Sequence, residues 1–289
     1  MASRNLKIFW TVCLVAVGAG LVGLTFSPKF SLAEWTGGGA VLFAVILGMA
    51  FVAEYVDSSL GMGYGTTLTP VLIIVGFEPL QIVPAILLSE FLSGLTAGGL
   101  HHRAGNVDFG RGTRERKLAG VLAACSAVGA VAAVALALNL PKNTVNLYIG
   151  FMIVAIGLFI LFGGRVLGAF SWPKVVALGV VAAFNKGISG GGYGPLITGG
   201  QVIVGVPEKK AVGITSLAEG LVCLVGLALY LAFQGALEWR LALPLCTGAL
   251  LSVPAATWTV KVLPADILRR SIGYGTSFLG LLTLAKVAL

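Results

Sequence analysis

The hydrophobic residues of this chain form long uninterrupted runs rather than the periodic patterns of soluble helices and strands. Five runs approach the ~20 apolar residues that a membrane-spanning helix needs: Ile8–Phe26, Gly37–Val56, Leu118–Leu140, Thr144–Phe162 and Leu241–Val260. Two further apolar stretches, Thr66–Phe77 and Pro195–Val206, each follow a glycine-rich segment. Helices of about 12 residues cover only ~18 Å, roughly half the hydrocarbon core. The pattern predicts an all-α polytopic membrane protein with two short, interrupted helices.

Composition indicates a lipid rather than an aqueous environment. Of the 289 residues, 57% are hydrophobic and 10% are charged, and the mean hydropathy is +0.99. Soluble domains carry roughly 25% charged residues, so this chain has too few polar side chains to cover a water-soluble globule. The formal charge of +8 comes from lysines and arginines that gather in short loops, the bias expected of cytoplasmic loops. We therefore expect the lipid bilayer, and no nucleic acid, as the partner of this basic chain.

The sequence contains an internal duplication. A shift of 129 residues aligns Ala53–Leu100 with Ala182–Leu229 without a gap, and it places "AEYVDSSLGMGYGTTLT" over "AAFNKGISGGGYGPLIT". Each half contains a long or broken helix, a glycine-rich break, a short helix and then three full helices. We therefore expect three parts: an extra N-terminal transmembrane helix with its connection at residues 1–34, a first repeat at 35–163 and a second repeat at 164–289.

The distribution of basic residues predicts that the two repeats have opposite orientations in the membrane. The loop "HHRAGNVDFGRGTRERK" is strongly basic and is expected on the cytoplasmic side, whereas the equivalent loop "QGALEW" is weakly charged and is expected outside. This topology puts the N-terminus in the cytoplasm and the C-terminus outside. Half-helices must be shielded from lipid, so the two breaks should meet at mid-membrane. Inverted repeats with interrupted helices are typical of secondary transporters, whose substrate site lies at the repeat interface.

The two glycine-rich breaks are candidate anion-binding segments. A break frees backbone N–H groups, and the positive dipole end of the following helix lies at the gap. The candidate substrate-binding residues of the first break are Gly61, Gly63, Tyr64, Gly65, Thr66 and Thr67, and those of the second break are Gly190, Gly191, Gly192, Tyr193 and Gly194. The alternative is that the glycines only allow helices to pack closely, as small residues do in membranes.

Charged residues inside apolar helices are costly to bury and should face the protein interior with a partner. Lys186 occupies the repeat position of Asp57. It either pairs with that carboxylate or binds an anionic substrate, and the two roles can alternate. Glu90 and Glu219 are also repeat equivalents. These carboxylates either accept hydrogen bonds from the freed N–H groups or carry protons.

The sequence resembles the TauE/SafE family of sulfite exporters. The resemblance lies in "DSSLGMGYGTTLTP", in "GISGGGYGPL" about 130 residues later and in "HHRAGNVDF" between them, and it extends from about Leu42 to the end of the chain. It implies a transporter that moves sulfite or a small organosulfonate, such as sulfoacetate, outward across the bacterial inner membrane by alternating access. The residues themselves indicate only a small anion.

Other functions stay open as alternatives. Paired helix ends around a pore also fit an anion channel, and the four cysteines allow a thiol-based sulfur relay, although neither break contains a cysteine. We expect no enzymatic activity, because the sequence shows no nucleophile with a base and no cluster of metal ligands within the membrane. No cofactor and no metal are expected, and the sequence does not indicate an oligomeric state.

Overall fold

The computed structural model describes residues 38–162, 171–203 and 206–260, together with six positions between 274 and 285. The chain divides into two compact units, Met1–Val45 and Ile46–Leu289. Of the first unit, residues 38–45 are described, and they begin helix α2. The N-terminal helix predicted within residues 1–34 lies outside the described residues.

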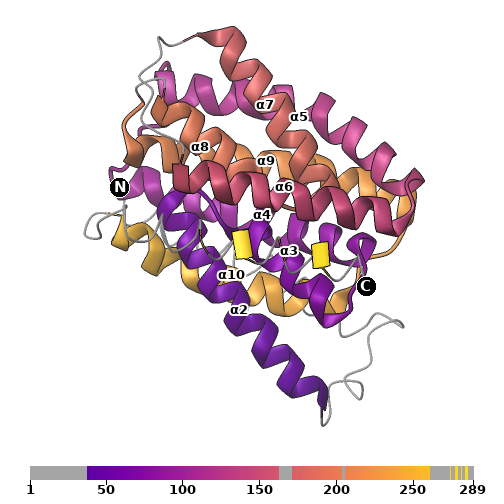
Figure 1. Cartoon of the computed structure of the whole chain (residues 1–289). Helices are drawn as coiled ribbons and strands as arrows, with labels where there is room; N and C mark the ends of the chain where they lie inside the picture. The colour runs from indigo at the N-terminus through magenta and orange to yellow at the C-terminus, as the bar shows by residue number, and fades with distance from the viewer. Residues whose placement is uncertain are drawn as a thin grey trace. The chain divides into compact units, whose positions relative to one another are not determined.

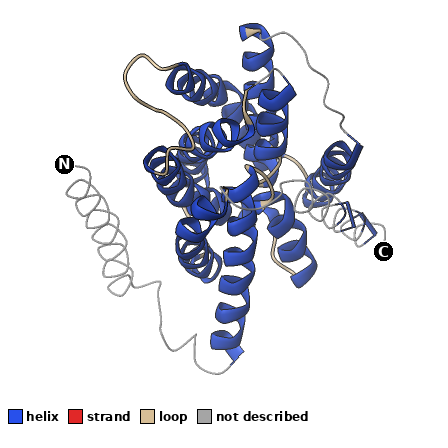
Figure 2. Ribbon diagram, turned by 90° about the vertical axis from the view of Figure 1, so that its left-hand side faces the viewer, coloured by secondary structure: helices blue, strands red, loops and turns tan. Residues whose placement is uncertain are grey.

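Every regular secondary-structure element in the described ranges is an α-helix (Figure 1). Figure 2 shows these helices joined by loops. The helices are α2 Gly38–Leu60, α3 Tyr64–Val75, α4 Pro79–Arg103, α5 Arg114–Asn139, α6 Lys142–Phe162, α7 Trp172–Ser189, α8 Tyr193–Ile203, α9 Glu208–Gln234 and α10 Trp239–Thr259. Among the described residues, α2, α4, α5, α9 and α10 are long and apolar enough to cross a membrane. The all-α architecture with apolar spans is therefore confirmed.

Local capping chemistry fixes where several of these helices begin and end. The side chains of Glu78 and Gln81 form a capping box at the start of α4, which satisfies two amides that the first turn leaves unbonded. Thr113 caps α5 by accepting a hydrogen bond from the Arg116 amide (3.4 Å). At the C-terminal end of α9, Gly235 adopts a left-handed conformation (φ 67°), in which glycine is the preferred residue.

Within the second unit, α4 and α9 are the most buried of the apolar spans, and α9 has several neighbours. It packs against α4, α5 and α8, while α7 packs against α5 and α8 and α10 packs against α4 (Figure 1). Because α4 and α9 are repeat equivalents, the contact between them joins the two halves along their middle helices.

Both predicted breaks are present in the structure. Helix α2 ends at Leu60 and α7 ends at Ser189, and each is followed by a glycine with a positive φ angle, Gly61 (69°) and Gly190 (73°). Gly63 and Gly192 are the last residues of the two breaks that have a positive φ angle. The backbone can therefore become helical at the next residue. The short helices therefore begin at the two tyrosines, two residues earlier than the sequence pattern predicted.

The two breaks pack directly against each other through their backbones. A Cβ atom on Gly65 would overlap the carbonyl oxygen of Gly190, and a Cβ atom on Gly194 would overlap the carbonyl oxygen of Gly61. The 129-residue shift exchanges these two contacts, because it relates Gly61 to Gly190 and Gly65 to Gly194. Each break therefore makes the same contact with the other one.

Threonine hydroxyls from the short helices reinforce this crossing. Thr69 donates to the carbonyl oxygen of Ser189 (2.8 Å), and its repeat equivalent Thr198 donates to that of Gly61 (2.8 Å). These carbonyl groups lie at the ends of the interrupted helices, where no further turn supplies a donor. Each short helix thus satisfies the end of the long helix from the other half.

We predict that side chains at the crossing separate the two breaks. Gly65→Ala and Gly194→Ala should each lower the free energy of unfolding by about 1–3 kcal/mol or more, because overpacking forces the backbone to shift. The matched control is Gly48→Ala in α2, where a Cβ atom would meet nothing within 4 Å. Thermal unfolding in detergent measures the three variants, and equal stability for all of them would contradict the crossing.

Candidate functional site

Lys186 lies in the last turn of α7, directly before the second break. Its carbonyl oxygen accepts a hydrogen bond from the Gly190 amide (2.8 Å), and its side chain is fully buried. Among the lysines and arginines whose exposure the structure describes, it is the one buried side chain. The Lys186 ammonium forms ion pairs with Glu90 and with Glu219 (2.7 Å to Oε1).

The two glutamates reach one ammonium because α4 and α9 approach closely. A Cβ atom on Gly94 would lie 2.7 Å from the Ser216 carbonyl oxygen, and one on Gly220 would lie 3.0 Å from the Leu95 amide nitrogen. Gly94 follows Glu90 by one helical turn, and Gly220 follows Glu219 directly. The absence of side chains at these glycines lets carboxylates from both repeats meet at the same lysine.

These contacts correct the expected roles of the acidic residues. The ion-pair partners of Lys186 are Glu90 and Glu219 rather than Asp57. Asp57 instead accepts a hydrogen bond from the Tyr64 amide (3.3 Å), one of the amides that the break frees. In the first half, Asp57 therefore caps a freed amide, which is one of the two roles considered for the glutamates. Helix packing determines which carboxylates pair with Lys186, because it puts the middle of α4 and α9, rather than the end of α2, beside the ammonium.

Sequence reasoning missed a fourth buried carboxylate. Glu54 lies one turn before Asp57 in α2, is 1% exposed, and accepts a hydrogen bond from the Ser58 hydroxyl (2.6 Å). Its other oxygen, Oε2, is buried without a hydrogen-bond partner among the described residues. The signal was available, because acidic residues three apart within an apolar run share one helix face.

A thiol also lies at this cluster, although neither break contains a cysteine. Cys223 is buried on α9, one turn after Glu219, and its sulfur is 3.8 Å from Glu90 Oε2. The sequence spacing alone could not show that a residue of α9 touches a side chain of α4.

The polar side chains of the breaks are buried to different degrees. Tyr64 is fully buried, shares a hydrogen bond with the Ser89 hydroxyl (2.6 Å) and donates to the Leu245 carbonyl oxygen (3.3 Å). Tyr193 is fully buried as well. Thr66 is buried, and its hydroxyl has no hydrogen-bond partner among the described residues. Thr67 is half-buried.

The glycines of both breaks are buried, and the breaks meet as expected. Gly65, Gly191 and Gly194 lie against the backbone of the opposite break, and a Cβ atom on Gly191 would lie 2.6 Å from the Thr66 amide nitrogen. For these three residues the geometry agrees with the close-packing alternative. Their role in binding an anion stays a prediction.

Comparison with known proteins identifies the family. Residues 45–283 match the family described as "Sulfite exporter TauE/SafE". The chain belongs to the TauE/SafE family. It is also 26% identical over 237 residues to the "Probable membrane transporter protein YtnM" of Bacillus subtilis (strain 168), covering 76% of this chain and 74% of that relative. No solved structure matches the chain. The protein is therefore an integral membrane protein and a membrane transporter of this family.

In this TauE/SafE protein, equivalent carbonyl oxygens near the ends of the two interrupted helices accept side-chain hydrogen bonds. The donor residues differ between the two repeats. His101 Nδ1 is 3.0 Å from the Asn106 side-chain nitrogen, which donates to it, so His101 Nε2 carries the proton given to the Ser58 carbonyl oxygen (2.9 Å). The repeat equivalent of this contact is the Tyr230 hydroxyl, which donates to the Gly187 carbonyl oxygen (2.9 Å). His101 is fully buried.

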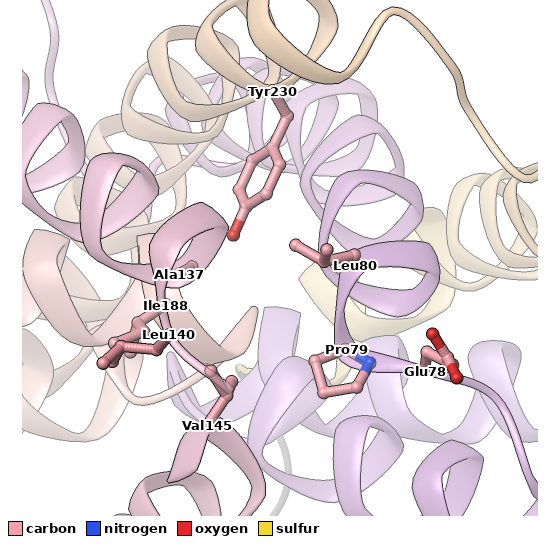
Figure 3. Close-up of a pocket in the computed structure, with 8 residues that line it drawn as sticks. All are labelled: Glu78, Pro79, Leu80, Ala137, Leu140, Val145, Ile188 and Tyr230. Atoms are coloured by element: carbon pink, nitrogen blue, oxygen red, sulfur yellow. The ribbon is translucent and has the colours of Figure 1, made fainter. Parts of the chain in front are cut away.

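A small cavity of this family member leads toward the second break. It has a volume of about 60 Å³ and is lined by Glu78, Pro79, Leu80, Ala137, Leu140, Val145, Ile188 and Tyr230 (Figure 3). Figure 3 shows the Tyr230 ring reaching from α9 toward Ala137 and Leu80. Glu78 at one end is exposed, whereas Ile188 lies two residues after Lys186. The lining is mostly apolar.

We predict that Lys186 stabilises this TauE/SafE fold as the counterion of two buried carboxylates. Lys186→Met should lower the free energy of unfolding by about 3–5 kcal/mol, because it leaves buried charges uncompensated. Adding Glu90→Gln and Glu219→Gln should restore much of the loss. The control is Lys210→Met: Lys210 pairs with Glu115 (2.6 Å) with its side chain 45% exposed, so about 0–1 kcal/mol is expected. Similar losses for Lys186→Met and Lys210→Met in thermal unfolding would contradict this role.

Proposed function

We propose that this TauE/SafE protein is a secondary transporter that carries a small anion outward across the bacterial inner membrane by alternating access. The proposed substrates are sulfite and small organosulfonates such as sulfoacetate. The observation that carries the proposal is the crossing of two glycine breaks, one from each repeat, beside a buried lysine. The name of the family model agrees with an anionic sulfur substrate.

The proposed site lies where the first turns of α3 and α8 meet. Helix N-termini favour anions through their unbonded amides and the helix dipole. The Thr66 hydroxyl, which is buried without a partner among the described residues, offers a hydrogen bond there. Lys186 supplies a full positive charge in a region with little water, where electrostatic attraction is strong. The remaining members of the proposed site are Gly61, Gly63, Tyr64, Gly65, Thr67, Gly190, Gly191, Gly192, Tyr193 and Gly194.

We further propose that the two repeats, residues 35–163 and 164–289, are inverted relative to each other in the membrane. The exchangeable contacts of Gly65 and Gly194 support a two-fold relation between the halves, and the equivalent donors Thr69 and Thr198, which each bond the end of the opposite long helix, agree with it. Loop charge supports the opposite orientations, with the N-terminus in the cytoplasm and the C-terminus outside. The cavity beside Tyr230 would then open toward the outside and serve as one approach to the site.

Accessible cysteines test the proposed orientation. In a background without native cysteines, Arg111→Cys should react with an impermeant maleimide from the cytoplasmic side, and Ala236→Cys should react from outside. Both positions are exposed, and Ala236 avoids the positive φ angle of Gly235. Reaction of both cysteines from the same side would contradict the inverted arrangement.

Transport assays in proteoliposomes test the function. Labelled sulfite uptake should saturate and should be accelerated by unlabelled sulfite on the opposite side, since a carrier returns faster when it is loaded. Thr66→Val should raise the half-saturating concentration without lowering thermal stability. Uptake that stays linear with concentration and shows no trans-stimulation would instead indicate a channel. Loss of transport after replacing Cys13, Cys125, Cys223 and Cys246 with alanine, in a protein that still folds, would favour a sulfur relay.

A further inference from the structure

The Lys186 ammonium is already occupied on two sides. Glu90 and Glu219 both contact it, and the lysine and the two glutamates are each at least 95% buried. An anion that enters this tightly packed space competes with these two carboxylates for the ammonium. A displaced carboxylate would then be a buried charge without a counterion, which is a strongly unfavourable state.

Among the residues whose exposure the structure describes, no second lysine or arginine is buried that could pair with the displaced carboxylate. The titratable groups that interact with Lys186, Glu90 or Glu219 are Glu54 and Asp57 on α2, Tyr64 on α3 and Cys223 on α9. Four carboxyl groups therefore lie around one buried ammonium, so acidic groups outnumber basic ones here before any substrate enters. A further anion needs an accompanying positive charge, and a proton is the one that a carboxylate accepts directly.

We propose that Glu90 and Glu219 are the proton-binding residues of this transporter, so that an anion and a proton bind together at the Lys186 cluster. The anion takes the place of one carboxylate at the ammonium. The displaced carboxylate oxygen forms an O–H bond with a proton from the water on the side from which the anion came. One negative and one positive charge enter, so the buried net charge stays the same. A dianion displaces both carboxylates and takes two protons.

The arrangement of the cluster supports this exchange. Glu90 Oε1 is buried without a hydrogen-bond partner among the described residues, so it can take a proton without breaking a hydrogen bond. Both repeats supply an equivalent glutamate, whereas the second repeat alone supplies the lysine. Either carboxylate can therefore leave the ammonium while the other one keeps it in place.

This inference rests on the proposed anion transport and changes which gradients drive it. If charge enters and leaves as a neutral pair, the membrane potential does not drive the anion, because the potential acts only on net charge. The anion and pH gradients then set the direction of transport. If one proton is taken up with each anion, the affinity for the anion should also fall roughly tenfold for each unit by which the pH rises.

Proton and anion fluxes in proteoliposomes test the inference. Methanesulfonate is a suitable probe because it keeps a single negative charge across the whole working pH range, so every proton counted is bound by the protein. With a pH dye inside the vesicles and the potential clamped by valinomycin and potassium, methanesulfonate and protons should enter in equal numbers. Uptake should be insensitive to the clamped potential and should increase with an inward proton gradient.

The variants Glu90→Gln and Glu219→Gln separate proton binding from a structural role. A glutamine neither pairs with the ammonium as a charge nor takes up the proton. The anion should therefore bind without a proton, so that uptake follows the potential and loses most of its pH dependence. A merely structural glutamate would leave the proton-to-anion ratio unchanged.

Two results would overturn the inference in different ways. If the natural protein moves methanesulfonate along the potential without protons, proton coupling is wrong and the proposed anion transport stands. If neither sulfite nor methanesulfonate moves, the proposed function fails and the inference fails with it. The proton count uses the natural protein, so it does not depend on whether the glutamine variants fold.

Discussion

The structure depends on burying one ammonium group among apolar helices. Lys186 is fully buried, and a charge in that environment is tolerated only with a partner of opposite sign. Two glutamates, one from each repeat, provide that partner. Their convergence requires α4 and α9 to touch at Gly94 and Gly220. The helix contact that joins the two halves of the molecule is therefore also the contact that provides the lysine with its counterions.

Glycine serves two different purposes in this protein. At Gly61 and Gly190 it allows the positive φ angles that end a helix within an apolar segment. At Gly65 and Gly194 the φ angle is ordinary, and the missing side chain lets one backbone lie directly on another. The two uses occur within five residues of each other in both breaks. Each break therefore both ends a helix and packs against the other break.

The two halves share a scaffold but differ in their ionisable residues. Asp57 corresponds to Lys186, Glu54 to Ala183 and His101 to Tyr230. The scaffold contacts are hydrogen bonds and backbone packing, which the repeated glycines and threonines preserve. A second lysine at the Asp57 position would add a like charge close to the first one, whereas a carboxylate there caps the amide of Tyr64. Symmetric packing thus coexists with an asymmetric charge distribution.

The sequence by itself determined the helical architecture, the duplication and both breaks, and it singled out Lys186, Glu90 and Glu219, because apolar run length, the 129-residue shift and glycine spacing are local or directly comparable along the chain. It placed the short helices within two residues of their observed starts. Tertiary structure decided which residues meet. The partners of Lys186, the approach of Cys223 to Glu90 and the bond from His101 to Ser58 all depend on how α2, α4, α7 and α9 pack together. A linear pattern does not contain that geometry, since side chains far apart in sequence are brought together only by helix packing.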